Sequence, residues 1–237
     1  MNGGFRVAVL LLAAWCATAP AIAQDSERSR YYIQQMIELA ASNDEAGVTA
    51  MQRMLEQEPR PTPRDPAAAR AALQRGQAAL RAEDLNAALA AFQQASQDDP
   101  GSADAVNHLG LVQRKLDRLP DAERDLQRAL ALEPTRAGAW FQLAQIYGLT
   151  EDVRRARGAL ANTYRFAQNP MRAEEILRNI AESEVSDTLR NAALETLRLY
   201  QLPVEAVIVP PMPANPGIVP LKTPPGSTPR AMNPARP

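Results

Sequence analysis

The chain has 237 residues, of which 46% are hydrophobic and 5% aromatic, and its 26 basic and 27 acidic residues give a formal net charge of −1 at pH 7. A nucleic-acid-binding protein needs a basic excess to displace counterions from phosphates. The composition therefore argues against nucleic acid as a partner.

The first 23 residues have the pattern of a secretory signal peptide. Arg6 precedes an apolar run from Val7 to Trp15, and small residues stand at Ala21 and Ala23. The apolar run is too short to cross a bilayer core of roughly 30 Å as a helix, so an uncleaved anchor is the less favoured alternative. We predict cleavage near Ala23 and export to the bacterial periplasm.

Cys16 is the only cysteine, and it lies inside this predicted signal peptide. A lipoprotein signal has a small residue directly before its cysteine, whereas Trp15 stands there, so lipid attachment is not expected. After cleavage the chain would contain no cysteine. Disulfides, thiolate nucleophiles and cysteine-ligated zinc would then be excluded together.

A helical hairpin is predicted over 24–59. Apolar residues recur at three- and four-residue spacing from Arg30 to Ala41 and from Asp44 to Glu58, on either side of a polar break. Whether this degenerate repeat stacks on the following ones or stays apart from them is open. A proline-rich connector is predicted over 60–68.

Three segments share one pattern with a period of thirty-four residues: 69–102, 103–136 and 137–170. Small residues recur at the eighth and twentieth places and larger apolar residues at the twenty-fourth, namely Gly76, Gly110 and Ala144; Ala88, Ala122 and Ala156; and Phe92, Leu126 and Leu160. Each copy is predicted to form two amphipathic helices joined by a tight turn. The small residues allow the two helices to approach closely, and a large side chain at Ala122 would overpack them by about 1 to 3 kcal/mol.

The repeating pattern resembles the tetratricopeptide repeat. The resemblance rests on Trp140, Leu143 and Tyr147 in the third copy, on Leu109 and Gly110 in the second, and on Gly76, Ala88, Phe92, Ala95 and Pro100 in the first. The first copy departs from the family pattern because Ala72 stands where a tryptophan is usual. The resemblance implies an all-α fold, an α-solenoid of antiparallel helix-turn-helix repeats.

The chain after the repeats divides into two parts. Helices are predicted within 171–202, where they would cap the last stacking face of the solenoid. Over 203–237, eleven of thirty-five residues are proline, which predicts a disordered or polyproline II tail. The β-prone run from Val204 to Val209 could add as a strand to a sheet edge of a partner or fold back onto the capping helices, and both options stay open.

No group of residues predicts catalysis. His108 is the only histidine, and the sequence has neither a Gly-rich phosphate loop nor a spaced set of metal ligands, so we expect no catalytic residue, no metal and no cofactor. Adjacent acidic pairs such as Glu83-Asp84 and Glu151-Asp152 are expected to be solvated helix caps, and Glu174-Glu175 to open a helix.

The resemblance implies a concave groove lined by the first helix of each repeat. The places that face the groove in the family hold Arg70, Leu73, Gln74, Gln77 and Arg81; Asp104, Asn107, His108, Leu111 and Arg114; and Phe141, Gln142 and Gln145. Amides and arginines suit the carbonyls and carboxylates of an extended peptide. The alternatives are packing between repeats for Phe141 and Leu111, and a solvated helix face for the arginines.

Some family members hold a C-terminal carboxylate with a clamp of lysines, asparagines and an arginine. The corresponding places here hold Leu73, Gln77, His108, Gly138 and Gln142, so a ligand of that kind is not implied.

These features together predict a non-catalytic scaffold of the bacterial cell envelope that binds a peptide or protein in its groove, without nucleic acid and without stable membrane insertion. The excess of arginine over lysine and the abundant alanine fit a bacterial gene rich in G and C. Two alternatives remain: a periplasmic chaperone or assembly factor for envelope or secretion proteins, and an accessory subunit that modulates an envelope enzyme.

Overall fold

The computed structural model describes residues 27–203, which belong to the larger of two compact units of the chain. A first helix covers 27–41, and it is followed by α2 (Glu45–Glu56), α3 (Pro66–Arg81), α4 (Leu85–Asp98), α5 (Ala103–Lys115), α6 (Leu119–Leu132), α7 (Ala137–Leu149), α8 (Val153–Arg165), α9 (Pro170–Ser183) and α10 (Asp187–Leu199). The predicted signal peptide and the tail beyond Pro203 lie outside the described residues.

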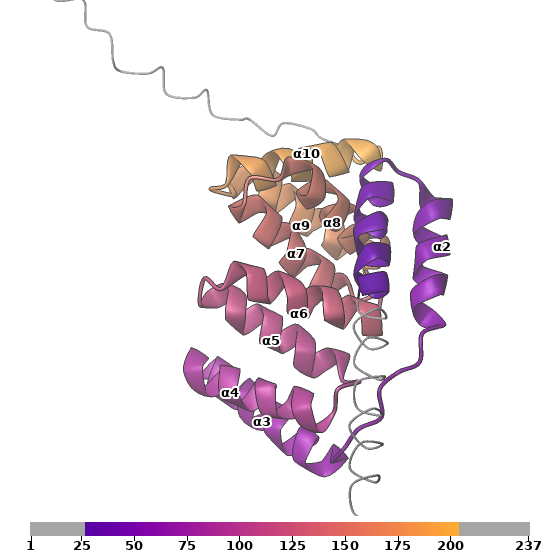
Figure 1. The fold of residues 1–237 in the computed structure, drawn as a ribbon. Helices are drawn as coiled ribbons and strands as arrows, with labels where there is room; N and C mark the ends of the chain where they lie inside the picture. Colours follow the sequence, from indigo (N-terminus) through magenta and orange to yellow (C-terminus); the bar gives the residue numbers. More distant parts are fainter. Residues whose placement is uncertain (1–26, 204–237) are drawn as a thin grey trace, which may run out of the picture. The chain divides into compact units, whose positions relative to one another are not determined.

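The three repeats are antiparallel helical pairs that stack in chain order (Figure 1). Within the repeats α3 packs on α4, α5 on α6, and α7 on α8, while α4 meets α5 and α6 meets α7 between neighbouring repeats. The pair α9 and α10 then packs on α8 and α7. The described residues contain no strand, and the predicted all-α solenoid is confirmed.

The small residue at the eighth place of each repeat touches the apolar residue at the twenty-fourth. A Cβ added to Gly76 would lie 2.5 Å from the Phe92 ring, and one added to Gly110 would lie 2.7 Å from Leu126. Both distances are far shorter than van der Waals contact. A glycine is therefore required at this place in the first and second repeats, whereas the third repeat holds Ala144.

The turn inside each repeat has the same backbone geometry. Glu83, Asp117 and Glu151 each adopt a left-handed conformation with φ of 59°. In the first and third repeats the next residue, Asp84 or Asp152, caps the second helix with its carboxylate, as expected for these acidic pairs. In the second repeat the corresponding residue is Arg118, and α6 begins without a side-chain cap.

Two local predictions were wrong. α3 begins at Pro66, inside the predicted connector, because the Asp65 carboxylate caps the helix and proline suits its first turn. The pair Glu174-Glu175 does not open a helix, because α9 already begins at Pro170 with Asn169 as its cap. Glu174 instead pairs with Arg178 one turn later, at 2.7 Å.

The N-terminal hairpin packs along the side of the stack and against its second helices. In Figure 1 the first helix and α2 lie beside the upper repeats and not below α3 and α4. Met36 and Ile37 of the first helix are buried in one apolar cluster with residues of α6 and α8, such as Leu126 and Leu160. The open question about this hairpin is thereby answered: it is attached to the repeats, but sideways.

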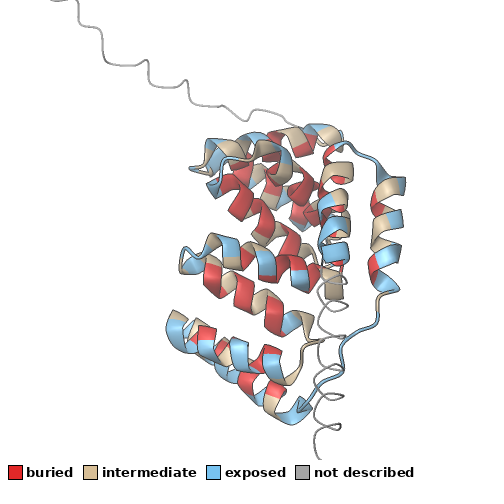
Figure 2. Cartoon of the chain, viewed as in Figure 1, coloured by how far each residue is buried: buried red, intermediate tan, exposed pale blue. Residues whose placement is uncertain are grey.

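Burial is uneven along the stack (Figure 2). The largest apolar cluster joins the first helix to α6, α7, α8 and α10, and it contains Trp140 and Tyr147. The first repeat has only small separate clusters, around Phe92 and around Ala72, and three residues of α3 are buried. The first repeat is consequently the least embedded of the three.

Candidate functional site

The predicted groove residues lie on the first helices of the three repeats. We call the surface formed by α3, α5 and α7 the first-helix face. α3 carries Arg70, Gln74, Gln77 and Arg81; α5 carries Asn107, His108 and Arg114; and α7 carries Phe141, Gln142 and Gln145. Arg70, Gln74 and Arg81 are exposed, and the other members of this set are half-buried.

Arg114 and Gln142 join two neighbouring first helices directly. Arg114 Nε on α5 donates a hydrogen bond to Gln142 Oε1 on α7 at 2.8 Å. Burial lowers the pKa of the Arg114 guanidinium, although arginine keeps its charge. Nε alone makes this bond, so the terminal nitrogens of the guanidinium are not used by Gln142.

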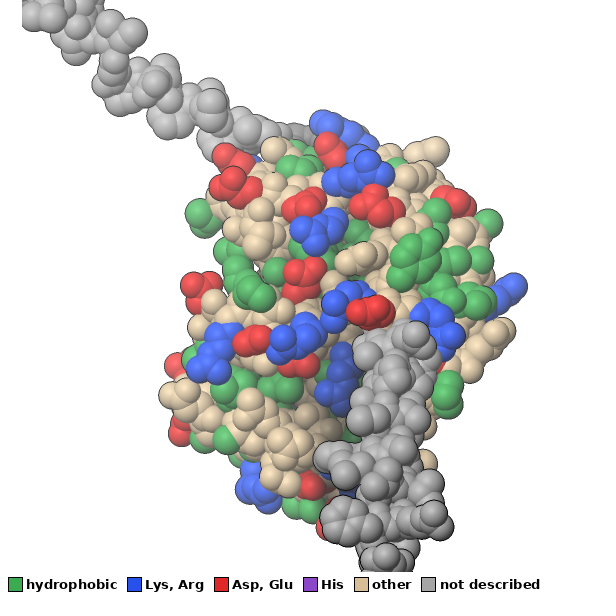
Figure 3. Space-filling model, viewed as in Figure 1, with side chains coloured by type: hydrophobic (Ala, Val, Ile, Leu, Met, Phe, Trp, Pro, Cys, Tyr) green, Lys and Arg blue, Asp and Glu red, His purple; other side chains and the backbone are tan. Residues whose placement is uncertain are grey.

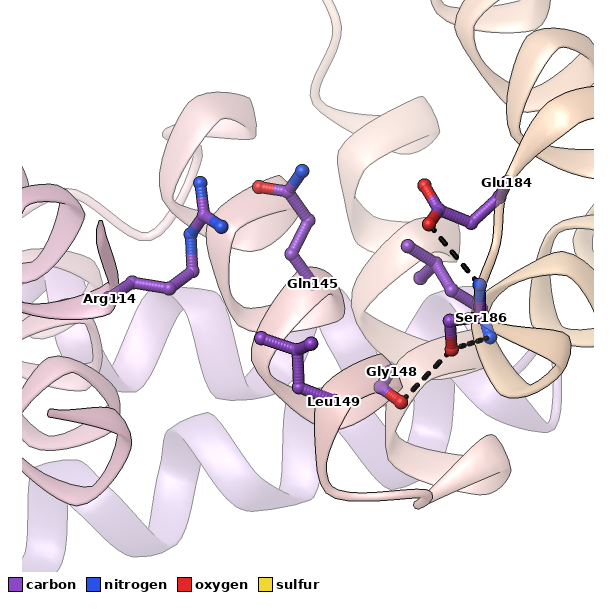
Figure 4. Close-up of a pocket in the computed structure, with 7 residues that line it drawn as sticks. Arg114, Gln145, Gly148, Leu149, Glu184 and Ser186 are labelled. Atoms are coloured by element: carbon purple, nitrogen blue, oxygen red, sulfur yellow. Dashed lines mark hydrogen bonds between the residues drawn. The ribbon is translucent and has the colours of Figure 1, made fainter. Parts of the chain in front are cut away.

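A shallow hollow of about 100 Å³ opens beside this pair (Figure 4). It is lined by Arg114, Gln145, Gly148, Leu149, Glu184, Ser186 and Leu189, so it joins α5 and α7 to the turn between α9 and α10. Figure 4 shows Arg114 and Gln145 on one side of the hollow and Glu184 on the other. The hollow thus has a cation, an amide, aliphatic side chains and a carboxylate in its wall.

Hydrogen bonds hold the far wall of the hollow in place. The Glu184 carboxylate accepts from the backbone N–H groups of Val185 and Ser186 at 3.0 and 3.3 Å. The Ser186 hydroxyl donates to the Gly148 carbonyl at 3.1 Å, which ties the α9–α10 turn to α7. A rigid wall of this kind presents the same surface before and after a ligand binds.

Two of the predicted groove residues with amide side chains hold acceptors without partners. Asn107 Oδ1 and Gln145 Oε1 are buried and accept no hydrogen bond within the described part of the chain. An unsatisfied buried acceptor costs about 1 to 3 kcal/mol. A donor on a bound chain would remove that penalty once the amide turns toward it, and Gln145 already lines the hollow.

His108 takes part in the packing between repeats. Its ring stacks on Phe92 of the preceding repeat, with centroids 5.0 Å apart and planes inclined by 13°. Burial lowers the pKa of His108, while the neighbouring Asp104 partly opposes this change. His108 therefore serves the packing between the first and second repeats, and Phe141 likewise packs against the main apolar cluster.

Five residues of the hollow were not predicted: Gly148, Leu149, Glu184, Ser186 and Leu189. Leu149 stands at the thirteenth place of the third repeat, a groove place in the family, so the repeat register could have found it. Glu184, Ser186 and Leu189 come from the capping helices and the turn between them, where no repeat register applies.

Residues 27–203 contain neither a metal-binding cluster nor a helix suited to a membrane. The described residues form no group of three or more histidine, cysteine or acidic side chains able to hold a metal ion. Of the helices in this range, none has the length and apolar character needed to cross a membrane.

Comparison with protein families assigns the chain. The tetratricopeptide repeat matches at 37–103, 73–137 and 108–170, which together cover more than half of the 237 residues. The chain belongs to the tetratricopeptide repeat family. Repeats of this family are protein-interaction modules, and membership supports a role as a protein-interaction scaffold.

Solved structures with a similar fold include an O-GlcNAc transferase mutant from Thermobaculum terrenum, 26% identical over 59% of this chain, with a TM-score of 0.46. This chain spans 28% of the transferase chain. Two structures of the MamA protein are 22% and 21% identical over 74% and 69% of this chain and 93% and 92% of theirs, with TM-scores of 0.46 and 0.45. A comparison with curated proteins gave no match.

Proposed function

We propose that this tetratricopeptide repeat protein is a non-catalytic scaffold of the bacterial periplasm that binds a peptide or protein partner on its first-helix face. The proposal rests on one observation: the two sides of the stack differ in what covers them. The N-terminal hairpin occupies the side formed by α6 and α8, whereas the first-helix face holds a hollow and unsatisfied amides.

The contacts of the hairpin cover the side formed by α6 and α8. Asn162 and Gly158 of α8 touch the backbone of Met36 and Ile37 so closely that no other chain could fit between them. Glu38 of the first helix also pairs with Arg154 of α8 at 2.5 Å. The first-helix face is covered by no comparable element among the described residues, which favours it for binding.

The side chains of the first-helix face suit an extended chain. Amide groups both donate to and accept from backbone groups, so Gln74, Gln77, Asn107 and Gln145 can each bond a peptide unit. Recognition through the backbone depends little on sequence, and the hollow would then select one side chain of the partner.

Affinity capture from a periplasmic extract tests the face. We expect the combined substitution Arg81→Ala, Arg114→Ala and Gln142→Ala to abolish partner recovery. A matched control, Arg118→Ala, Arg198→Ala and Gln97→Ala, removes the same residue types away from this face and should recover the partner normally. Equal recovery by both variants, with unchanged circular dichroism, would refute binding on the first-helix face.

The proposed location in the periplasm rests on the signal-peptide pattern of the first 23 residues. We expect the protein in the periplasmic fraction with Gln24 as its N-terminus by intact-mass spectrometry. A chain that keeps Met1 and stays in the cytoplasmic fraction would contradict export.

The captured partner also separates the scaffold from its alternatives. A folded partner at fixed stoichiometry supports a scaffold, and an unfolded client held without fixed stoichiometry identifies a chaperone. An enzyme whose activity changes on binding identifies an accessory subunit.

A further inference from the structure

The helices of the first-helix face carry more basic than acidic residues, in a chain whose net charge is −1. The helices α3, α5 and α7 contain one acidic residue, Asp104, against five basic ones: Arg70, Arg75, Arg81, Arg114 and Lys115. Asp104 is already paired with Arg136, the residue directly before α7, at 2.8 Å. The charge of the five basic residues is thus not balanced within the helices themselves, and the turns that follow these helices hold other carboxylates, at Glu83, Asp117 and Glu151.

The basic residues of the first helices also have no ion-pair partners in the described part of the chain, in contrast to those of α8. All four arginines of α8 pair with carboxylates: Arg154 with Glu38, Arg155 with Asp152 and Glu123, Arg157 with Glu195, and Arg165 with Glu45. Figure 3 shows one face of the molecule, on which acidic and basic side chains lie next to one another. Free cations gathered on one side of a protein attract acidic ligands and speed their association.

The hollow at the end of this basic face has an apolar wall. Leu149 is 57% exposed at its edge, and Val185, beside Glu184 and Ser186, is 92% exposed. Gly148 lets α10 pack closely on α7 at the floor of the hollow, because a Cβ there would lie 2.9 Å from Leu189. A hollow of about 100 Å³ whose wall includes Leu149 and Leu189 has room for one aliphatic side chain.

We propose that the partner segment bound here is acidic and carries an aliphatic side chain that enters the hollow between Arg114 and Leu149. This inference rests on the proposed function and specifies the chemistry of its partner. The carboxylates of the segment pair with Arg81 and Arg114. Glu184 stands at the opposite wall and repels carboxylates, so the acidic residues lie on the α3 and α5 side of the aliphatic anchor.

Fluorescence anisotropy with labelled synthetic peptides tests the inference on the full processed chain. The reference peptide has a run of glutamates beside one leucine. Its matched partners replace the glutamates with glutamines or lysines, or the leucine with glycine. We expect the reference peptide to bind at least about tenfold more tightly than each of the others, and its affinity to fall with added salt as the charges are screened.

Charge-matched variants locate the binding. The double variant Arg81→Gln with Arg114→Gln should bind the reference peptide about tenfold more weakly, or weaker still. The double variant Arg118→Gln with Arg198→Gln removes the same charge elsewhere, and its affinity for the peptide should change by less than about twofold. Glu184→Gln should strengthen binding, because the amide can still accept the two backbone N–H groups while the repulsion disappears.

Each opposite result overturns the inference. Equal affinity for the glutamine peptide, equal loss in both double variants, or no binding of the reference peptide at all would show that the partner is not acidic or not bound here. If a substitution at Gln142 still reduces partner recovery in that case, the proposed function is retained although this inference fails. Capture insensitive to Arg81, Arg114 and Gln142 would remove the proposed function itself.

Discussion

Asn162 on α8 donates a hydrogen bond from Nδ2 to the backbone carbonyl of Met36, at 3.1 Å and across 126 residues of sequence. Asn162 is completely buried, so this bond forms away from water. It fastens the N-terminal helix to the second helix of the third repeat. The hairpin that precedes the solenoid is therefore part of its lateral packing.

Gly158 makes the same contact possible, one turn earlier on α8. A Cβ at this position would lie 2.1 Å from the Ile37 carbonyl oxygen, so Gly158→Ala must push the first helix away from α8. We expect a loss of about 1 to 3 kcal/mol in the free energy of unfolding, measured with urea, and faster amide exchange over 27–41. Gly138→Ala is the matched control, since nothing lies within 4 Å of its added Cβ, and it should leave stability unchanged or slightly higher.

The missing cap of α6 predicts a stabilising substitution. Arg118 occupies the place held by the capping residues Asp84 and Asp152 in the other repeats, yet it makes no cap hydrogen bond. Arg118→Asn should supply one and raise the unfolding free energy by about 1 kcal/mol. Arg118→Ala removes the same side chain without adding an acceptor, so a melting temperature that is equal in both variants would disprove the capping explanation.

His108 should titrate below the ordinary pKa of histidine, because burial on Phe92 disfavours its charged form. As it is the only histidine, its ring protons give one unambiguous NMR signal. The unfolded chain binds the proton more readily, so stability should be complete above the ordinary pKa and should fall as the pH drops through it toward the folded value. A titration at or above the ordinary value would contradict the stacked, desolvated environment.

The pKa of Asp125 is shifted in the opposite direction to that of His108. Burial raises its pKa, and the hydrogen bond from Gln113 Nε2, at 2.9 Å, only partly compensates. The folded chain therefore holds the proton of the Asp125 carboxyl group more tightly than the unfolded chain. The contribution of the protonated carboxyl group to folding stability is lost as the pH rises through the folded pKa. Asp125→Asn keeps an acceptor for Gln113 without the buried charge, so it should melt at a higher temperature than the parent at pH 7. A lower melting temperature would show that the carboxylate is well solvated.

Contacts within the repeat could be predicted from the sequence because they recur at a fixed period. The approach of Gly76 to Phe92 and of Gly110 to Leu126 follows from the spacing of small and large residues. The helix ends at Asp84 and Asp152 follow equally from local chemistry, since a carboxylate before an apolar run caps a helix.

Contacts outside the period could not be predicted in this way. The bond between Asn162 and Met36 joins segments with no common register, and nothing local to either residue indicates the other. The same holds for the wall formed by Glu184 and Ser186, which reaches the hollow only through the packing of α10 on α7. The repeat register predicts His108 in the groove, but it does not predict that the ring stacks on Phe92 between the first and second repeats.

Photocrosslinking in living cells tests most directly whether the partner binds on the first-helix face. A photoreactive amino acid is placed at Gln74 or Leu149 on that face, and at Gln97 or Arg198 on second helices, all four of which are exposed. Binding on the first-helix face predicts partner crosslinks from 74 and 149 and none from 97 and 198. Crosslinks confined to 97 or 198 would contradict it.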